Sequence, residues 1–164
     1  MRIEELKVGQ EILYSGKLIV MRDQAHKRLK DMVEKGEELP VDLMGAVVFY
    51  AGPAKTPPGR PIGAIGPTTS ARMDDYLEML FRLGVIATVG KGKRTGKAIE
   101  VCKKWKRVYF VAPSGTAAAL AKRVKRARLI AFEDLGPEAI YELEVEDFPL
   151  LVAIDSLGNS VFGE

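Results

Sequence analysis

The segment Gly66–Asp74 combines a Gly-Pro turn, three consecutive hydroxyl residues and an arginine, in the order GPTTSARMD. A helix that begins after such a turn leaves its first backbone N–H groups unpaired, and these groups attract anions. Arg72 can add a two-pronged hydrogen bond to a carboxylate or a phosphate. Serine and threonine also cap helices without any further role, so two alternatives remain open: an anion site, or plain capping with Arg72 in solvent.

Two other segments place cationic side chains beside expected turns. Arg22 precedes an expected helix, and His26, the single histidine of the chain, would lie in the first turn of that helix. Such a histidine is a candidate for acid–base chemistry, or a local partner of Asp23 and the backbone. Lys91 opens the loop GKGKRTG, whose glycines allow close approach of an anion but whose spacing differs from that of a Walker nucleotide site.

Charge is unevenly distributed along the 164 residues, although the formal net charge is only +3. Residues 1–90 are neutral, residues 91–128 carry a net charge of +12, and residues 129–164 carry −9. This pattern allows a nucleic-acid surface, with Trp105 and Tyr109 stacking on bases, or a site for an acidic small molecule. Mutual neutralisation of the two segments after folding is the default interpretation.

Composition limits the classes of protein that remain. With 47% hydrophobic and 29% charged residues, the chain is typical of a folded domain with one core, and disorder is excluded as the main state. The single cysteine, Cys102, can form no internal disulfide and no multi-thiolate metal site, which fits a reducing cytoplasm. We expect neither a signal peptide at the N-terminus nor a membrane span, which needs about 20 apolar residues.

Short apolar runs alternate with amphipathic stretches, which is typical of a layered α/β domain with helices covering a sheet. Two short runs flank a turn or hairpin expected at Ser15–Lys17. A Gly- and Pro-rich stretch at 52–67 is typical of a functional loop. Asp23 is the expected N-cap of the first helix. Helices are expected over 23–35, 70–83, 95–105 and 116–125, and strands over 46–50, 85–89, 108–111, 129–132, 138–145 and 150–154.

Taken together, these motifs resemble the β subunit, or C-terminal domain, of the class I iron–sulfur-dependent fumarate and tartrate hydro-lyases. The resemblance runs in order from about residue 8 to 162. The stretch Gly66–Asp74 is its most specific part. The other matching segments are Ser15–Gly16, Arg22–Arg28, Tyr50–Pro53, Gly90–Gly92, Glu133–Ile140, Asp147–Pro149, Asp155 and Gly158–Asn159.

The resemblance implies a single swivelling β/β/α domain over residues 1–164. It also implies a partner, because in this family a separate α subunit or N-terminal region holds a four-iron four-sulfur cluster that one cysteine could not ligate. We therefore expect no metal or cofactor on this chain, an active site at an α/β subunit interface, and an α2β2 heterotetramer in the cytoplasm. The expected substrate is a dicarboxylate, fumarate or malate, and we expect neither a nucleic-acid nor a membrane partner.

The resemblance also implies roles for individual residues. Arg22 and Arg72 match the carboxylate-binding arginines of the family, and Lys91 matches its substrate-binding lysine. Thr68 matches the threonine proposed as the base that removes the C3 proton, with Thr69 as a neighbouring hydrogen-bond donor. A threonine hydroxyl is a weak base in water, so this role requires local activation, for which Lys91 and the helix terminus are candidates. Asp23 and His26 are expected to be structural.

Three alternatives remain beside a fumarate hydratase β subunit. Tartrate differs from malate by one hydroxyl group, and nothing in this chain visibly recognises that position, so a tartrate dehydratase is a close competitor. A basic nucleic-acid-binding module would use residues 91–128 and would show steeply salt-dependent binding. A non-catalytic assembly subunit would tolerate alanine at Thr68, Arg72 and Lys91.

Overall fold

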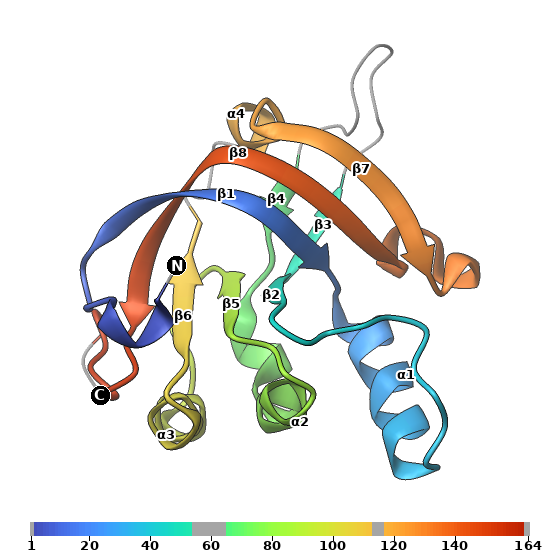
Figure 1. Ribbon diagram of the computed structural model, residues 1–164, viewed down its shortest axis with the longest axis horizontal. Coiled ribbons are helices and arrows are strands. Elements are labelled where there is room, and N and C mark those ends of the chain that lie inside the picture. Colours follow the sequence, from blue (N-terminus) through green and yellow to red (C-terminus); the bar gives the residue numbers. More distant parts are fainter. Residues whose placement is uncertain (1, 54–64, 113–116, 163–164) are drawn as a thin grey trace.

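Two long strands and their shorter neighbours form one domain that mixes strands and helices, as Figure 1 shows. The computed structural model describes residues 2–53, 65–112 and 117–162. The α/β class expected from the alternation of apolar runs is confirmed. Among the described residues, no helix is long and apolar enough to cross a membrane.

The strands are β1 (Glu11–Val20), β2 (Val47–Phe49), β3 (Ala51–Pro53), β4 (Ile65–Pro67), β5 (Ala87–Gly90), β6 (Val108–Val111), β7 (Val124–Ala131) and β8 (Ile140–Ile154). The α-helices are α1 (Asp23–Glu34), α2 (Leu77–Arg82), α3 (Gly96–Trp105) and α4 (Ala117–Ala121). Three 3-10 turns complete the described elements: η1 (Ile3–Glu5), η2 (Ser70–Tyr76) and η3 (Glu133–Glu138).

The strand pairings close on themselves. β1, β2, β5 and β6 are parallel neighbours in that order, β6 pairs antiparallel with β8, and β8 pairs antiparallel with β1. β7 adds to the far edge of β8, and β3 and β4 form a separate two-stranded sheet. In Figure 1 β1, β8 and β7 arch across one side of the molecule, with α1, α2 and α3 on the opposite side. The ring is closed only at the end of β1, because β1 pairs with β2 through Ile19 and Val20 alone.

Alternation along the strands divides the core in two. Leu18, Val20, Phe49 and Phe110 belong to a cluster shared almost entirely among strands, including β8. The intervening residues of the same strands pack against the helices instead, because successive side chains of a strand point to opposite faces. This second cluster includes Ile19, Val48 and Tyr109 from the strands, and Ala25, Leu29, Met73, Leu77, Leu80, Phe81, Ala98, Val101 and Cys102 from α1, η2, α2 and α3.

Several predicted elements differ from the observed ones. The segment Ser15–Lys17, expected as a turn, is part of the continuous strand β1. The register shifts there because Ser15 faces two residues of β8, Glu146 and Asp147, so the bulge lies on β8. The N–H of Asp147 donates to Ser15 Oγ at 3.0 Å. This hydrogen bond joins the two strands across the bulge, so β1 bends there but continues as a strand. The two strands expected over 138–145 and 150–154 are likewise one strand, β8.

Two predicted helices are also revised. The helix expected over 116–125 is only α4. Lys125, Arg126 and Arg128 lie instead on strand β7, because β8 offers that segment a partner. The helix expected over 70–83 begins as the 3-10 turn η2 and becomes α-helical only at Leu77. Asp23 is the first residue of α1, whose N-cap is Arg22.

Candidate active site at the edge of the parallel strands

The parallel strands of the ring end at one common edge. β1 ends at Val20 and is followed by Arg22 and α1; β2 ends at Phe49 and is followed by Tyr50; β5 ends at Gly90 and is followed by Lys91. In open α/β sheets, ligands bind outside the carboxyl ends of such strands because the connections and helix N-termini gather there. The predicted site residues therefore arrive at one edge from separate parts of the chain.

Backbone hydrogen bonds tie the hydroxyl segment to Lys91. The N–H of Thr68 donates to the carbonyl of Tyr50 at 2.6 Å, and the N–H of Lys91 donates to the carbonyl of Thr68 at 3.2 Å. The N–H of Ser70 returns the contact by donating to the carbonyl of Lys91 at 3.1 Å, which forms a parallel bridge between Thr69 and Lys91. Thr68 and Thr69 are thus held beside Lys91 as if they were a short extra strand.

Close approach of the backbone makes this arrangement possible. A Cβ atom on Gly90 would lie only 1.9 Å from the hydroxyl oxygen of Ser70 and 3.1 Å from the ring of Tyr50. Gly90 is therefore required where η2 crosses the end of β5, since any side chain would push the two segments apart. The first glycine of the loop GKGKRTG thus serves packing against Ser70.

Arg72 contacts the start of α1, next to the N-cap residue Arg22. Arg72 donates from Nε and Nη2 to the two carboxylate oxygens of Asp23, at 3.0 and 3.1 Å. The Arg72 hydrogen bond holds the pKa of Asp23 below its usual value. Arg22, the N-cap residue of α1, is half-buried, and its Nε has no hydrogen-bond partner among the described residues. A buried donor of this kind is costly unless a ligand accepts its hydrogen bond.

His26 lies beneath these arginines and is fully buried between the rings of Tyr50 and Tyr76, each 5.4 Å away between centroids. Its Nδ1 donates to the carbonyl of Arg22 at 2.7 Å, and Nε2 has no partner among the described residues. Burial lowers the pKa of His26 to about 4, so the ring is neutral at pH 7. This geometry favours the structural role expected from the sequence.

Exposure separates the predicted residues into two groups. Thr69, Arg72 and Lys91 are exposed, whereas Thr68 and Arg22 are half-buried. The exposed members can meet a molecule from outside, and the half-buried members line the base of the same edge. The cationic side chains are suited to anions, and the arrangement offers them from three different connections.

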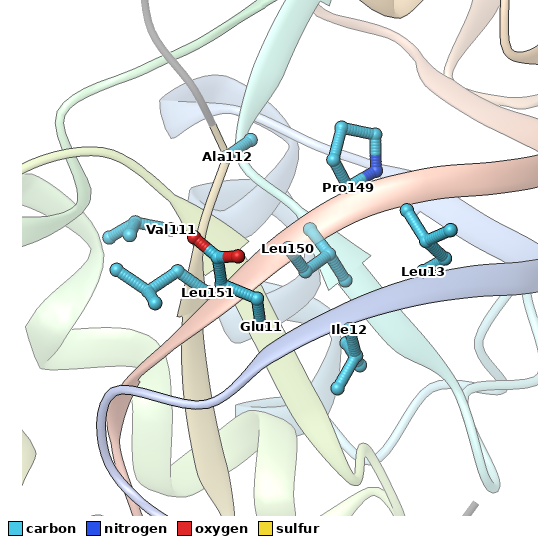
Figure 2. Close-up of a pocket in the computed structure, with 8 residues that line it drawn as sticks. All are labelled: Glu11, Ile12, Leu13, Val111, Ala112, Pro149, Leu150 and Leu151. Atoms are coloured by element: carbon cyan, nitrogen blue, oxygen red, sulfur yellow. The ribbon is translucent and has the colours of Figure 1, made fainter.

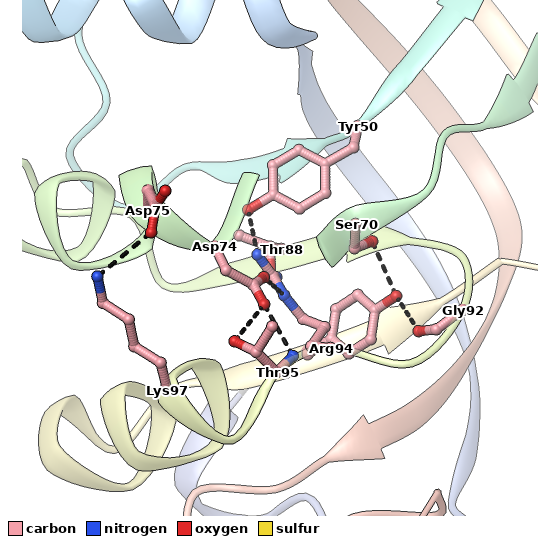
Figure 3. Close-up of polar contacts among 10 residues, drawn as sticks. Tyr50, Ser70, Asp74, Asp75, Thr88, Gly92, Arg94, Thr95 and Lys97 are labelled. Carbon is pink, nitrogen blue, oxygen red and sulfur yellow. Dashed lines mark hydrogen bonds and ion pairs between the residues drawn. The ribbon is translucent and has the colours of Figure 1, made fainter. Parts of the chain in front are cut away.

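A second set of polar side chains lies directly below this edge and is shown in Figure 3. Arg94 is completely buried and donates to the carboxylate of Asp74, to Thr88 Oγ1 at 3.0 Å and to Tyr50 Oη at 3.1 Å. Its guanidinium carbon lies 5.0 Å from the Tyr50 ring centroid and 4.9 Å from that of Tyr109. Although burial disfavours the cation, Tyr50 and Asp74 raise the pKa of Arg94.

The residues of this chain differ from the ligand set of an iron–sulfur cluster, the group expected from the family resemblance. Such a cluster needs several thiolates, and the chain has one cysteine. Cys102 is buried on α3, and burial raises the pKa of its thiol to about 12. No group of three or more His, Cys, Asp or Glu side chains within residues 2–53, 65–112 and 117–162 could hold a metal. These residues do not fit the cluster.

A pocket of about 540 Å³ lies elsewhere, between the start of β1, the end of β6 and the middle of β8 (Figure 2). Its single charged residue is Glu11, and its other lining residues are Ile12, Leu13, Val111, Ala112, Pro149, Leu150 and Leu151. An apolar pocket whose only charge is negative is unsuited to a dicarboxylate. This pocket is therefore a poorer candidate for such a substrate than the cationic strand edge.

The family comparison covers the whole chain. Residues 1–164 match the family model described as "Fumarase C-terminus". The chain belongs to the fumarase C-terminus family. Fumarate hydratase 2 of Leishmania major is 40% identical to it over 99% of this chain and 29% of that protein. "Fumarate hydratase class I, anaerobic" of Escherichia coli K12 is 39% identical over 98% of this chain and 30% of that protein.

A shorter relative matches along most of its own length. L(+)-tartrate dehydratase subunit beta of Escherichia coli K12 is 34% identical over 99% of this chain and 82% of that subunit. The chain thus spans less than a third of the fumarate hydratases named above and most of the tartrate dehydratase subunit. The predicted resemblance to the hydro-lyases is confirmed, and the relatives carry both substrate names.

Sequence reasoning about this fumarase C-terminus chain missed Arg94, Asp74 and Tyr109 as parts of the site's support. Arg94 was counted only as one cation of the loop GKGKRTG, and Tyr109 only as a surface that could stack on bases. Tyr109 is buried, and the indole N–H of Trp105 donates to Glu78 at 2.9 Å. Both rings are thus engaged within the fold and are not free to stack on bases. One sequence signal could have indicated a buried ion pair: the acidic Asp74 directly follows Met73, a residue of the apolar face.

Proposed function

We propose that this chain supplies the substrate-binding part of a hydro-lyase that adds water reversibly to fumarate to give malate. The observation that carries the proposal is the backbone pairing of the Thr68–Ser70 segment with Lys91. This pairing puts the proposed base and the proposed substrate-binding lysine on adjacent segments at the edge where Arg22 also lies. Membership of a family whose relatives are named as hydro-lyases supports the same reaction class.

The chemistry assigned to these residues follows from their charges and donors. Two carboxylates need cationic partners, and Arg22, Arg72 and Lys91 supply them. Thr68 would take the C3 proton, with Thr69 donating a hydrogen bond to the substrate. Negative charge develops on the neighbouring carboxylate as this proton leaves, and fixed cations there stabilise the transition state more than the ground state.

The rest of the active site is assigned to a partner. Because the residues of this chain do not fit an iron–sulfur cluster, we propose that a separate α subunit holds the four-iron four-sulfur cluster in an α2β2 assembly. When bound, that cluster would supply a Lewis acid for the substrate hydroxyl. The exposed edge carrying Lys91 and Arg72 would then face the α subunit, and residues 1–164 would act as one swivelling β/β/α domain against it.

Tartrate dehydration is the second candidate, because one relative that is matched along most of its length is named as the beta subunit of an L(+)-tartrate dehydratase. The cations described above would bind tartrate as well as malate, since both substrates carry two carboxylates. Recognition of the extra hydroxyl group of tartrate would therefore fall to the partner subunit.

Co-expression with a cysteine-rich partner tests both candidates. We expect the purified complex to contain iron and to convert fumarate and malate, and the isolated chain to convert neither. The assay is run on fumarate, malate and both tartrate enantiomers. A complex that acts on tartrate alone would replace fumarate with tartrate as the substrate, whereas a complex that holds iron but acts on none of them would contradict the hydro-lyase proposal.

A further inference from the structure

The ion pair between Arg94 and Asp74 is unusual because it lies in the core. The Arg94 side chain has no exposed surface, and that of Asp74 is 4% exposed. Charges are rarely buried in this way unless they are paired and hydrogen-bonded, and an apolar pair of similar volume would pack at least as well. The pair is completely satisfied on the Asp74 side as well, because Asp74 Oδ2 accepts the N–H of Thr95 at 2.8 Å and its hydroxyl at 2.7 Å.

The partners of this pair are the segments that carry the site. Asp74 belongs to η2, four residues after Ser70, the last residue of the segment that pairs with Lys91. Arg94 and Thr95 belong to the loop that Lys91 opens, and Tyr50 supplies the carbonyl that accepts the N–H of Thr68. One guanidinium therefore connects η2, the Lys91 loop and the end of β2.

Tyr109 closes the network from β6. Its ring lies against Arg94, and its hydroxyl lies 2.8 Å from Ser70 Oγ and donates to the carbonyl of Gly92 at 2.9 Å. Ser70 follows Thr69 directly, and Gly92 follows Lys91 directly. A single hydroxyl group thus joins the neighbours of two proposed substrate-binding residues.

We propose that Arg94 and Asp74, with the hydroxyl of Tyr109, are positioning residues that hold Thr68 and Thr69 at a set distance from Lys91. This inference rests on the proposed function. Apolar packing alone lets segments slide past one another, whereas hydrogen bonds to a planar guanidinium fix both direction and separation. Such fixing matters because a displacement of about 1 Å at a reacting group can lower turnover about 100-fold.

The chain offers a matched pair of substitutions for the test. Asp74→Asn keeps the shape of the side chain and removes its charge beneath the site. Asp75→Asn makes the same change at the next residue, whose exposed carboxylate contacts Lys97 at 3.4 Å (Figure 3). Tyr109→Phe is the milder second variant, because it keeps the ring against Arg94 and deletes only the hydroxyl.

Two measurements are made on each variant. Steady-state kinetics of the co-expressed complex give kcat and KM per assembled complex. Hydrogen exchange of the isolated full chain follows the amides of Thr68, Ser70 and Lys91. The reference is the amide of Val152, which donates to the carbonyl of Gln10, just before β1. Hydrogen exchange does not depend on enzymatic activity. It therefore reports how firmly the network holds these segments even if the wild-type complex is inactive.

We expect Tyr109→Phe and Asp74→Asn to lower kcat about tenfold or more with a smaller change in KM. Exchange at the three site amides should rise about tenfold while that at Val152 is unchanged. Asp75→Asn should match the wild type in both. A merely structural role would speed exchange at Val152 too and leave kcat per complex unchanged. Either that result or a Tyr109→Phe variant that behaves like Asp75→Asn overturns the inference, whereas an inactive wild-type complex contradicts only the proposed function.

Discussion

In the folded chain the guanidinium of Arg72 already binds a carboxylate, the side chain of Asp23. Both hydrogen bonds are close to 3 Å, and both side chains are partly exposed. The geometry is the one a substrate carboxylate would need, so Asp23 keeps the fork of Arg72 oriented toward the start of α1 beside Arg22. An ion pair this exposed contributes little to stability, which leaves orientation as its main effect.

Replacing this fork with a point charge tests its role at the residue scale. Arg72→Lys keeps the positive charge but removes the paired donors, so we expect KM for the dicarboxylate to rise about tenfold or more. Arg82→Lys is the matched control, since Arg82 is an exposed arginine of α2 that contacts Glu78. Steady-state kinetics of the complex provide the measurement, and an unchanged KM for Arg72→Lys would show that the fork does not bind substrate.

Thr68 is tested through turnover. If its hydroxyl takes the C3 proton, Thr68→Ala should lower kcat about 100-fold or more while KM changes only a few-fold. Thr68→Ser keeps a hydroxyl group at the same backbone position and should retain much more activity. Equal turnover of the alanine variant and the wild type would remove Thr68 from the base role and leave the binding residues unaffected.

His26 predicts a pH dependence of stability. Its pKa is lowered by burial from 6.5 to about 4, so between these values the unfolded chain binds a proton that the folded chain does not. Stability should therefore fall as pH drops from about 6.5 to 4, by at most about 3 kcal/mol. Urea unfolding of the wild type and His26→Asn across this range measures the effect. The slope should become shallower in the variant, where carboxyl groups such as Asp23, whose pKa is lowered in the folded chain, still contribute toward pH 4. A flat wild-type profile would contradict the burial argument.

At the scale of elements, the site depends on how closely η2 crosses the end of β5. Gly90 allows the contact, and Ser70 fills the space that a side chain at Gly90 would occupy. The crossing then continues as the bridge between Thr69 and Lys91. The packing of η2 on β5 therefore places Thr69 beside Lys91, and a change in that packing would move these proposed site residues.

Two glycine substitutions should act with opposite signs. Gly90→Ala places a methyl group against Ser70 Oγ and should destabilise the fold by about 1 to 3 kcal/mol, because the core is overpacked. Gly96→Ala lies in the first turn of α3 with nothing within 4 Å, and should stabilise it by up to about 1 kcal/mol. Denaturant unfolding compares the two. Adding Ser70→Ala should recover part of the Gly90→Ala loss, and no recovery would place the strain elsewhere.

At the scale of the whole molecule, the separated charges of the sequence come together as neighbouring strands. β7, from the basic segment, pairs with β8, from the acidic one, and Arg126 and Arg128 contact Glu144 and Glu142 at 3.4 and 3.2 Å. Lys17 of β1 contacts Glu142 from the other side, at 3.9 Å. Mutual neutralisation, the default interpretation of the charge pattern, describes this face of the sheet.

This pairing predicts weak binding to nucleic acid. Because Glu142 and Glu144 offset the arginines of β7, the isolated chain should show no saturable binding to duplex DNA at micromolar concentration and about 150 mM salt. A chain with both Glu142→Gln and Glu144→Gln frees these arginines and should bind more tightly, with a steeper dependence on salt. Fluorescence anisotropy compares the two, and tight, steeply salt-dependent binding by the wild type would revive the nucleic-acid alternative.

Local features of the fold and the site were readable from the residues alone. Apolar periodicity predicted α1, α3 and β6 closely, because a helix or strand leaves its repeat in the order of its own residues. The segment Gly66–Asp74 indicated a possible anion site at a helix start and the hydro-lyase family, because its turn, hydroxyl groups and arginine are contiguous. Roles for these residues remain predictions that the variants above test.

Contacts between distant segments were decided only in three dimensions. Periodicity cannot say which strand pairs with another. The prediction therefore gave part of β7 as a helix, and it gave the segment of β1 opposite the bulge in β8 as a turn. The partner of Arg72 lies 49 residues away, and that of Arg94 lies 20 residues away. Arg94 is buried, and Lys91, three residues before it, is exposed. Both residues are cations, so residue type alone does not distinguish them. The way the chain segments cross at the edge of the parallel strands buries Arg94 beneath the proposed site and leaves Lys91 facing outward.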